Sequence, residues 1–455
     1  MQVKDHPTPA DGSFTPGIEK ESRRRGACPG LSAPMPTGDG LLVRFLPIGT
    51  VPLGSFTALC EAARQHGSGV VEITARGSVQ VRGLNAASAR CFADTIAARG
   101  IAAGDGIPVH CGALAGLDAA EMLDASALAA DLRRALAGAS LSARLGAKVS
   151  VALDGGGQVS LDRLSTDIRL RAALINGAVA WRVAVGGDAV SAAEIGVVAP
   201  ADAIEAVVRL LEVVAQHGRD VRARDILRAQ GIAPFRSALG TATRAREHRA
   251  QSRASPVSGR TSTSEAIGTY PLRDGSFAAA VGVAFGYADA SVLEQLARAA
   301  AAAGANGMRT APGRALVAVG LRHETVMQFT HAAEQLGFIA QADDPRRRVI
   351  ACAGAPICES GHIAARALAP VIAQAAAPYL DGAATIHVSG CTKGCAHSAP
   401  ATLTIVGMPG GCALVRGGSS RDAAFAVVPA GERELAAAVA EHLAAARRAR
   451  EAAHG

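Results

Sequence analysis

Residues 74–77 read Thr-Ala-Arg-Gly and residues 310–313 read Thr-Ala-Pro-Gly, and the segments around these two turns have one order of features. In both segments, 39–84 and 274–321, Asp-Gly is followed by a strand, a helix, a second strand, the Thr-Ala turn and a third strand, and a further helix comes next. The copies lie 236 residues apart, counted from position 74 to position 310. This repeat predicts an α+β fold with two duplicated halves.

The elements of both copies follow from the spacing of apolar residues, with period 2 in strands and period 3.6 in helices. We expect strands over 41–46, 79–82, 277–283 and 315–319, and helices over 55–66, 86–99, 291–303 and 323–336. Ser55 and Ser291 are the expected helix N-caps, and Gly67 and Gly304 are the expected C-terminal stops.

The rest of the chain predicts further strands and helices. Between the copies we expect a hairpin over 149–161 with the Gly155–Gly157 run as its turn, a strand over 178–185, an amphipathic helix over 201–217 and a polar linker over 240–268. After the second copy we expect a helix over 360–376, strands over 385–388 and 402–406, and a last helix over 432–451.

Composition excludes several classes of protein. A chain of 455 residues with 49% hydrophobic and 19% charged residues is globular and long enough for several domains. Ten Phe, three Tyr and one Trp are too few for a base-stacking platform, and a net charge of +7 is no polyanion-binding field, so we expect no nucleic-acid partner. Neither a signal peptide nor a long apolar span is apparent, which predicts a cytoplasmic protein without membrane contact.

The nine cysteines are an odd number in a chain with no export signal, so a disulfide framework is not expected. Five of them are scattered and are expected to be packing residues: Cys28, Cys60, Cys91, Cys111 and Cys412.

The other four cysteines form C-x5-C, 32 intervening residues and C-x3-C. They are Cys352, Cys358, Cys391 and Cys395. Two short loops that bring four thiolates together suit a cubane iron–sulfur cluster, with the predicted helix at 360 pointing its N-terminal amides at the cluster. A structural zinc site and unrelated buried thiols remain alternatives, whereas the C-x-x-C spacing of a redox dithiol is absent.

The paired cysteines, downstream of a duplicated module with Thr-Ala-Arg-Gly-Ser-Val-Gln at 74–80, resemble the sirohaem sulfite/nitrite reductase superfamily. Residues 24–44 and 389–400 are similar to its precorrin-oxidising branch, and the likeness runs from about residue 23 to the last helix. The resemblance implies a 4Fe–4S cluster on the four cysteines and a tetrapyrrole site between the halves. In the reductases the last cysteine, here Cys395, also bridges to the sirohaem iron.

The resemblance also divides the chain. It implies an N-terminal extension (1–30), a first ferredoxin-like half-repeat (31–102), a first reductase-like α/β domain (103–239), a linker (240–268), a second ferredoxin-like half-repeat (269–345) and a 4Fe–4S-binding reductase-like domain (346–455).

The carboxylates of a tetrapyrrole need cationic partners, and arginine binds them with two parallel hydrogen bonds. Arg76 and Lys148 match reductase positions that contact the macrocycle. Arg309 and Arg314 flank the second turn and are candidates for the same ligand, as is Lys393 between two cluster cysteines.

Three cations of the reductases are missing. Phe45, the 107–109 segment and Ser150 stand where reductases have basic residues. Their loss favours binding of a related macrocycle as substrate over binding of sirohaem as a fixed prosthetic group.

His362, His387 and His397 lie near the cluster segments and are candidate proton donors or ligands of a mononuclear non-haem iron. A histidine on a strand is more often a hydrogen-bonded structural residue, and that interpretation stays open for each.

The resemblance implies an O₂- and reductant-dependent monooxygenase that converts precorrin-3A into precorrin-3B, by hydroxylation and lactone formation, in aerobic cobalamin biosynthesis. NAD(P)H is the expected electron source, used directly or through an external donor, although no dinucleotide-binding glycine motif is present. A sirohaem-dependent sulfite or nitrite reductase is the alternative enzyme. A non-enzymatic iron–sulfur carrier or sensor that binds a tetrapyrrole is the third possibility.

Overall fold

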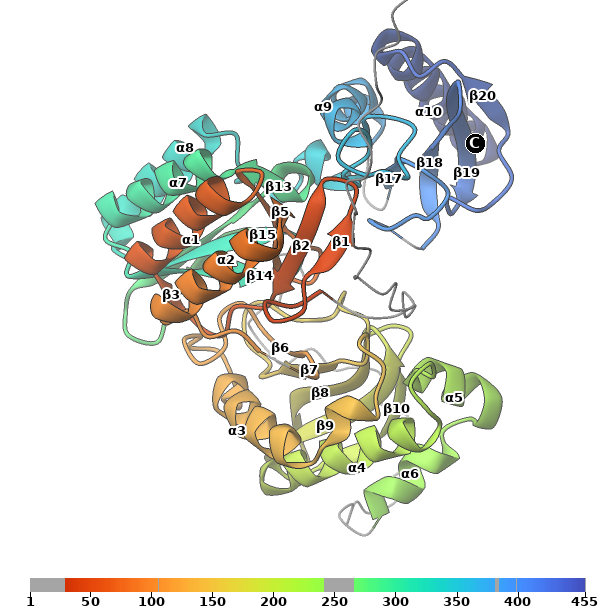
Figure 1. Cartoon of the computed structure of the whole chain (residues 1–455). Helices are drawn as coiled ribbons and strands as arrows, with labels where there is room; N and C mark the ends of the chain where they lie inside the picture. Colours follow the sequence, from red (N-terminus) through yellow and green to blue (C-terminus); the bar gives the residue numbers. More distant parts are fainter. Residues whose placement is uncertain (1–28, 105, 241–265, 381–383, 398, 455) are drawn as a thin grey trace, which may run out of the picture.

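A computed structural model describes residues 29–104, 106–240, 266–380, 384–397 and 399–454 (Figure 1). Cys28, nearly all of the predicted N-terminal extension and most of the predicted linker lie outside these residues. The described strands form four five-stranded sheets with helices packed against them, so the predicted α+β class is confirmed. None of the helices in the described part combines the length and apolar character needed to cross a membrane.

The two copies of the repeat form two similar modules. The first module consists of β1 (Met35–Thr37), β2 (Gly40–Phe45), β3 (Val51–Pro52), α1 (Leu53–His66), β4 (Val70–Ile73), β5 (Val79–Leu84) and α2 (Ala86–Ala98). The second module consists of β11 (Gly268–Pro271), β12 (Phe277–Gly282), β13 (Tyr287–Asp289), α7 (Ala290–Ala302), β14 (Gly307–Ala311), β15 (Ala315–Leu321) and α8 (Val326–Gln335).

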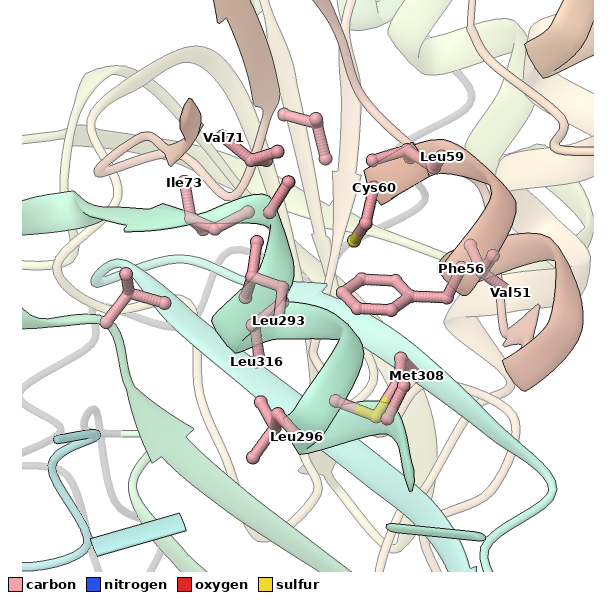
Figure 2. Packing of buried hydrophobic residues seen from close by; sticks show 14 of the residues in the cluster. Val51, Phe56, Leu59, Cys60, Val71, Ile73, Leu293, Leu296, Met308 and Leu316 are labelled. Carbon is pink, nitrogen blue, oxygen red and sulfur yellow. The ribbon is translucent and has the colours of Figure 1, made fainter. Parts of the chain in front are cut away.

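Each module gives one short strand to the sheet of the other. β13 pairs with β4, with Ala288 opposite Val71, and β3 pairs with β14, with Val51 opposite Met308. Helices α1 and α7 pack against each other, and their buried side chains meet in one hydrophobic core, in which Phe56 and Cys60 lie close to Leu293 (Figure 2). The modules therefore form one folding body.

The other two sheets form separate units beside the modules (Figure 1). The first α/β unit contains β6 (Val109–Cys111), α3 (Ala125–Gly138), β7 (Val151–Asp154), β8 (Thr166–Ile175), β9 (Ala178–Gly187), β10 (Ala193–Val198), α4 (Ala203–Gln216), α5 (Ala223–Gln230) and α6 (Ala233–Leu239). The second α/β unit contains β16 (Val349–Ala351), α9 (Ala365–Ala376), β17 (Ile386–Ser389), β18 (Ala401–Met408), β19 (Gly411–Gly418), β20 (Ala426–Val428) and α10 (Glu432–His454).

The hairpin predicted over 149–161 is wrong. Its first strand, β7, lies between β6 and β8 and pairs in parallel with both, while residues 155–161 form a loop. All four residues of β7 are buried, as is usual for a central strand covered on both faces. Its partners are distant in sequence, so local alternation could not identify them.

The predicted helix starts also need correction. Helices α1 and α7 begin at Leu53 and Ala290, and neither Ser55 nor Ser291 is a cap. The Ser55 hydroxyl instead donates to the Arg99 carbonyl at 2.8 Å. Helix α9 begins at 365, five residues later than expected, so its first amides do not directly follow the second cysteine. Gly67 and Gly304 do follow the ends of their helices.

The remaining predicted strands and helices are confirmed within a few residues. Among the scattered cysteines, Cys60 and Cys412 are buried and Cys111 is half-buried, as expected for packing residues. Cys91 is exposed on α2, so the packing prediction is wrong for it.

Candidate metal centre and adjoining cavity

The four clustered cysteines meet at one edge of the second α/β unit. Cys352 directly follows β16, and Cys391 and Cys395 lie in the loop after β17, its parallel neighbour. The carboxyl ends of parallel strands lie at the same edge of a sheet, which brings these loops together. Cys358 approaches from the segment that leads to α9, where its N–H donates to the Gly354 carbonyl at 2.7 Å.

Backbone amides support the sulfur atoms. The Gly390 N–H donates to the Cys352 Sγ at 3.0 Å, and the Gly354 amide also bonds this sulfur. A Cβ on Gly390 would lie 3.0 Å from the Gly354 Cα and 3.4 Å from the Cys352 Sγ, so the close approach of these loops requires glycine. Such N–H···S bonds stabilise thiolates and tune a bound cluster.

The charges around the thiols show that they converge. Burial raises the pKa of Cys352, and the neighbouring Cys391 and Cys395 raise it further. Burial and the other cysteines likewise raise the pKa of Cys395, whereas Lys393 and Arg82 oppose this. Four converging thiols with amide donors and two nearby cations are the ligand set that a 4Fe–4S cluster takes, and the residues fit it.

A single-ion site fits less well. In the described ranges, no three or more His, Cys, Asp or Glu side chains are arranged to hold one metal ion. The cysteines are therefore not placed as a tetrahedral zinc site requires. By the same finding, the candidate histidines belong to no group of three described ligands that could hold a mononuclear iron.

A cavity of about 360 Å³ adjoins the cysteine loops. It is bounded by residues of both halves, and Ala396 and His397, which directly follow Cys395, line it. No Asp or Glu is among the described residues of its wall. Five arginines line it: Arg163, Arg314, Arg346, Arg347 and Arg348.

Two of these arginines lack a compensating charge. Within the described part of the chain, neither the Arg314 nor the Arg348 guanidinium group makes a hydrogen bond or ion pair, although the Arg314 carbonyl accepts from the Val283 N–H. Burial lowers the pKa of Arg314 to about 10, so its side chain still carries a charge at neutral pH. By contrast, Arg346 pairs with Asp344 at 2.6 Å. Uncompensated cations in a partly buried wall are costly unless an anion binds them.

One of the three candidate histidines, His397, lines this cavity, and His387 lies beside it. His387 on β17 is fully buried, and both its ring nitrogens lack a hydrogen-bond partner in the described chain. Burial, with His397 and Arg314, lowers the pKa of His387 to about 4, so it is neutral near pH 7. The His397 ring lies 5.7 Å from the His387 ring, and burial lowers the pKa of His397 as well. His362 is exposed and is not among the residues that line the cavity.

The predicted substrate cations do not all meet. Of these, only Arg314 lines the large cavity, whereas Arg76 and Arg309 line a second, smaller one. Lys148 is exposed and lines neither. Lys393 is exposed, and its Nζ donates to the Ser360 hydroxyl at 2.7 Å. Arg309 and Arg314 thus line different cavities, and Pro312 lies in the wall of both, so their contact with one ligand stays a prediction.

Several arginines near the centre were not anticipated. Arg163 and the run at 346–348 join the cavity from distant segments, and the only signal was three consecutive arginines just before β16. Arg82 on β5 pairs with Asp39 at 3.1 Å and with Glu72 at 3.3 Å, and Arg366 of α9 also bonds Glu72. These pairs join the first module to the helix behind the cysteine loops.

Comparison with known proteins first defines the class. Residues 33–99 match the nitrite/sulfite reductase ferredoxin-like half domain. The fold is similar to that of the NirA protein of Mycobacterium tuberculosis, with a TM-score of 0.68 over 86% of this chain and 78% of that one, at 20% identity. The chain thus has the duplicated sulfite/nitrite reductase fold.

A curated relative then defines the family. The chain is 36% identical over 400 residues to a precorrin-3B synthase of Sinorhizobium sp., covering 88% of this chain and 84% of the relative. The chain therefore belongs to the precorrin-3B synthase family.

Proposed function

We propose that this protein is an O₂- and reductant-dependent monooxygenase that converts precorrin-3A into precorrin-3B, by hydroxylation and lactone formation, in aerobic cobalamin biosynthesis. The observation that carries the proposal is the cavity with five arginines and no carboxylate beside the cysteine loops. Membership of the precorrin-3B synthase family supports it, because that name implies a tetrapyrrole substrate, and carboxylate side chains on a tetrapyrrole need cationic partners.

The four cysteines would hold a 4Fe–4S cluster, which supplies one-electron transfer when bound. Around it, the arginines bind and orient the substrate carboxylates, since planar guanidinium groups form paired hydrogen bonds with them. Arg314 and Arg348 contribute most because no other described group neutralises them. His397 lines the cavity and can hold or release a proton there, while burial keeps His387 beside it neutral.

The described residues do not fit a mononuclear iron held by the protein alone, because only two of the three candidate histidines meet and no third donor joins them. No step is assigned to such an iron. We propose NAD(P)H as the ultimate electron source and, from the odd number of cysteines, a reducing cytoplasmic location.

The test begins with full-length protein purified without oxygen and assayed for iron, sulfide and chromophore. With precorrin-3A, O₂ and a reductant, we expect a product heavier by one oxygen atom. Intense sirohaem bands with six-electron reduction of sulfite or nitrite would instead indicate a reductase, and tetrapyrrole binding without turnover would indicate a carrier.

Variants test the cavity itself. Arg348→Gln and Arg314→Gln should each raise KM for precorrin-3A roughly 10- to 100-fold, because a hydrogen bond to a charged group contributes about 1.5–3 kcal/mol. Arg228→Gln is the control, since Arg228 is exposed on α5 outside the cavity wall. An unchanged KM in both cavity variants would contradict this assignment of the substrate site.

A further inference from the structure

The segment between β12 and β13 has an unusual backbone conformation. Phe285, in the turn over 284–286, has a φ of 56° and a ψ of 4°, which is the left-handed region that glycine favours. Among the described residues other than glycine, only three more have a positive φ, namely Ser140, Asn176 and Arg314. A Cβ makes this conformation unfavourable. The fold therefore holds a large apolar side chain on a backbone conformation that opposes it.

The equivalent turn of the first module is not strained in this way. The strand pairings show that positions 51 and 71 of the first module correspond to positions 288 and 308 of the second, 237 further along in both cases. The counterpart of Phe285 is therefore Ile48, which is not among the residues with a positive φ. The next residue is a left-handed glycine in both turns, with a φ of 71° at Gly49 and 85° at Gly286. The left-handed phenylalanine is thus peculiar to the second module.

Phe285 lines the cavity of about 360 Å³ that adjoins the cysteine loops. It is half-buried and packs against the hydrophobic core of the second α/β unit. Among the described residues of the cavity wall, it is the only Phe, Tyr or Trp. Phe285 therefore gives this arginine-rich wall its one flat apolar side chain.

A neighbouring aromatic residue supports the Phe285 ring. The ring centroids of Phe285 and Tyr287 are 6.5 Å apart, and the planes are inclined by 33°. The Tyr287 hydroxyl donates to the Arg366 carbonyl at 3.1 Å, and the Arg366 guanidinium lies 4.2 Å from the centroid of the Tyr287 ring. Because Arg366 belongs to α9, these contacts connect the strained turn to the helix behind the cysteine loops.

Backbone contacts hold the other side of the turn. The Val283 N–H donates to the Arg314 carbonyl at 2.8 Å, and the Gly286 N–H donates to the Val283 carbonyl at 2.9 Å. A Cβ on Gly286 would lie 2.7 Å from the Arg314 Cδ, so the glycine leaves the space in which the arginine side chain lies. Strained residues persist where their surroundings determine the conformation, and they gather at ligand sites. The strain at Phe285 therefore points to a ligand in the cavity that this residue lines.

We propose that Phe285 is a substrate-binding residue whose ring packs against the pyrrole rings of the tetrapyrrole and thereby makes the cavity selective for a macrocycle. Aromatic side chains pack on flat rings in offset or edge-to-face arrangements. The arginines of the wall bind carboxylates of any carrier, whereas Phe285 favours a carrier with rings. This inference rests on the proposed function, because it takes a tetrapyrrole as the occupant of the cavity.

The experiment measures binding separately from turnover. Full-length, cluster-containing protein is titrated with precorrin-3A without O₂ and without reductant, and the change in tetrapyrrole absorption gives the Kd. Phe285→Leu should raise this Kd roughly 3- to 10-fold, because an aromatic pair contributes more than its buried area alone. Phe285→Tyr keeps the flat ring and should bind within about twofold of the wild type. Phe285→Met also lacks the ring and gives the same test if Phe285→Leu does not fold.

Phe277→Leu is the matched control. Phe277 is a half-buried phenylalanine of β12 in the same module, and it lines neither cavity. This variant should keep the wild-type Kd. A second control is a ligand with carboxylates but no ring, butane-1,2,3,4-tetracarboxylate, which should compete with precorrin-3A equally well in the wild type and in Phe285→Leu.

The outcomes separate this inference from the proposed function. An unchanged Kd for precorrin-3A in Phe285→Leu would overturn the inference, and so would an equal loss of affinity for the ring-free competitor. If the wild type binds precorrin-3A but forms no oxygenated product, the proposed function is wrong, whereas a weaker Kd in Phe285→Leu still supports the role of Phe285. Absence of precorrin-3A binding by the wild type would overturn both.

Discussion

The two α/β units have the same spacing of strands and helices, but different groups join their loops. The first residues of β6 and α3 are 109 and 125, and those of β16 and α9 are 349 and 365, so both intervals span 16 positions. The loops after β7 and β17 are also equally long, over 155–165 and 390–400. In this frame four residues of the first unit occupy the positions of Cys352, Cys358, Cys391 and Cys395, namely Gly112, Asp118, Gly156 and Ser160.

Hydrogen bonds join the loops of the first unit. The buried Asp118 accepts from the Ala120 N–H at 2.8 Å and from the backbone and side-chain N–H groups of Gln158 at 2.6 and 2.8 Å. Asp118 therefore connects the two loops that the thiols occupy in the second unit. The same arrangement of loops can be held together by a carboxylate or by an iron–sulfur cluster. Only the cluster would give that edge of the sheet redox chemistry.

The largest expected effect comes from giving the second unit a residue of the first. Cys391→Gly should abolish iron and sulfide binding and all turnover, because a cluster needs every thiolate corner. Iron and sulfide assays with the visible absorption spectrum check this. Cys91→Ser, on the exposed face of α2, should retain full iron content; an unchanged cluster in Cys391→Gly would refute the ligand assignment.

The next effect concerns the carboxylate that closes the first unit. Asp118→Ala should lower the free energy of unfolding by about 3 kcal/mol, because it leaves buried N–H groups without acceptors. Urea denaturation measures it. Asp188→Ala is the comparison, since Asp188 caps a half-exposed turn, and it should cost about 1 kcal/mol. Equal costs for both would show that Asp118 does not join the loops.

A third difference is the buried His387, whose counterpart is Ala152. The pKa of His387 is lowered to about 4 from an ordinary value of 6.5, so between these pH values the unfolded chain binds more protons. Stability due to this group is therefore present above pH 6.5 and falls as pH falls. Between pH 7 and pH 5, we expect the free energy of unfolding to fall by about 2 kcal/mol because of His387.

His387→Ala tests this by denaturation at both pH values. The variant should be less stable at pH 7 but should lose less on acidification than the wild type. A parallel pH dependence in the two proteins would mean that His387 is not held neutral by burial.

The smallest effect is expected at Lys393, whose counterpart is Gln158. Lys393→Gln should change the free energy of unfolding by less than about 0.5 kcal/mol, as is usual for exposed positions. The reduction potential of the bound cluster should fall, because a cation beside the thiolates favours the more negative, reduced form. A redox titration against Arg228→Gln checks this, and a rise in potential would contradict it.

Local pattern predicted much of the fold. The modules were found because their strands and helices lie in one order around two similar turns, and periodicity fixed most elements. The hairpin prediction was wrong because β7 pairs in parallel with β6 and β8, which are distant from it in sequence. The serine caps were wrong because both helices begin earlier, at Leu53 and Ala290, where the preceding Pro52 and Asp289 make no side-chain cap hydrogen bond that a sequence pattern could reveal.

The site was predictable only where residue type was informative. Four cysteines in nine, closely spaced, identify the cluster edge, whereas the chain has 46 Lys and Arg residues, so arginine at 163 or 346–348 carried little signal. Arg309 and Arg314 are five residues apart yet face different cavities. Arg309 belongs to β14, and Arg314 has a φ of 61° in the turn that follows.

The exchange of β3 and β13 has a consequence during synthesis. The edge of β4 stays unpaired until β13 emerges, about 214 residues later along the chain from Ile73 to Tyr287. At roughly 5–20 residues per second, a ribosome needs about 10–40 s for that distance. An open strand edge is a template for pairing with other chains, so the nascent first half is exposed to misassembly for this interval. Slow decoding of the segment before Tyr287 would therefore lower the yield of folded protein without altering a single contact in it.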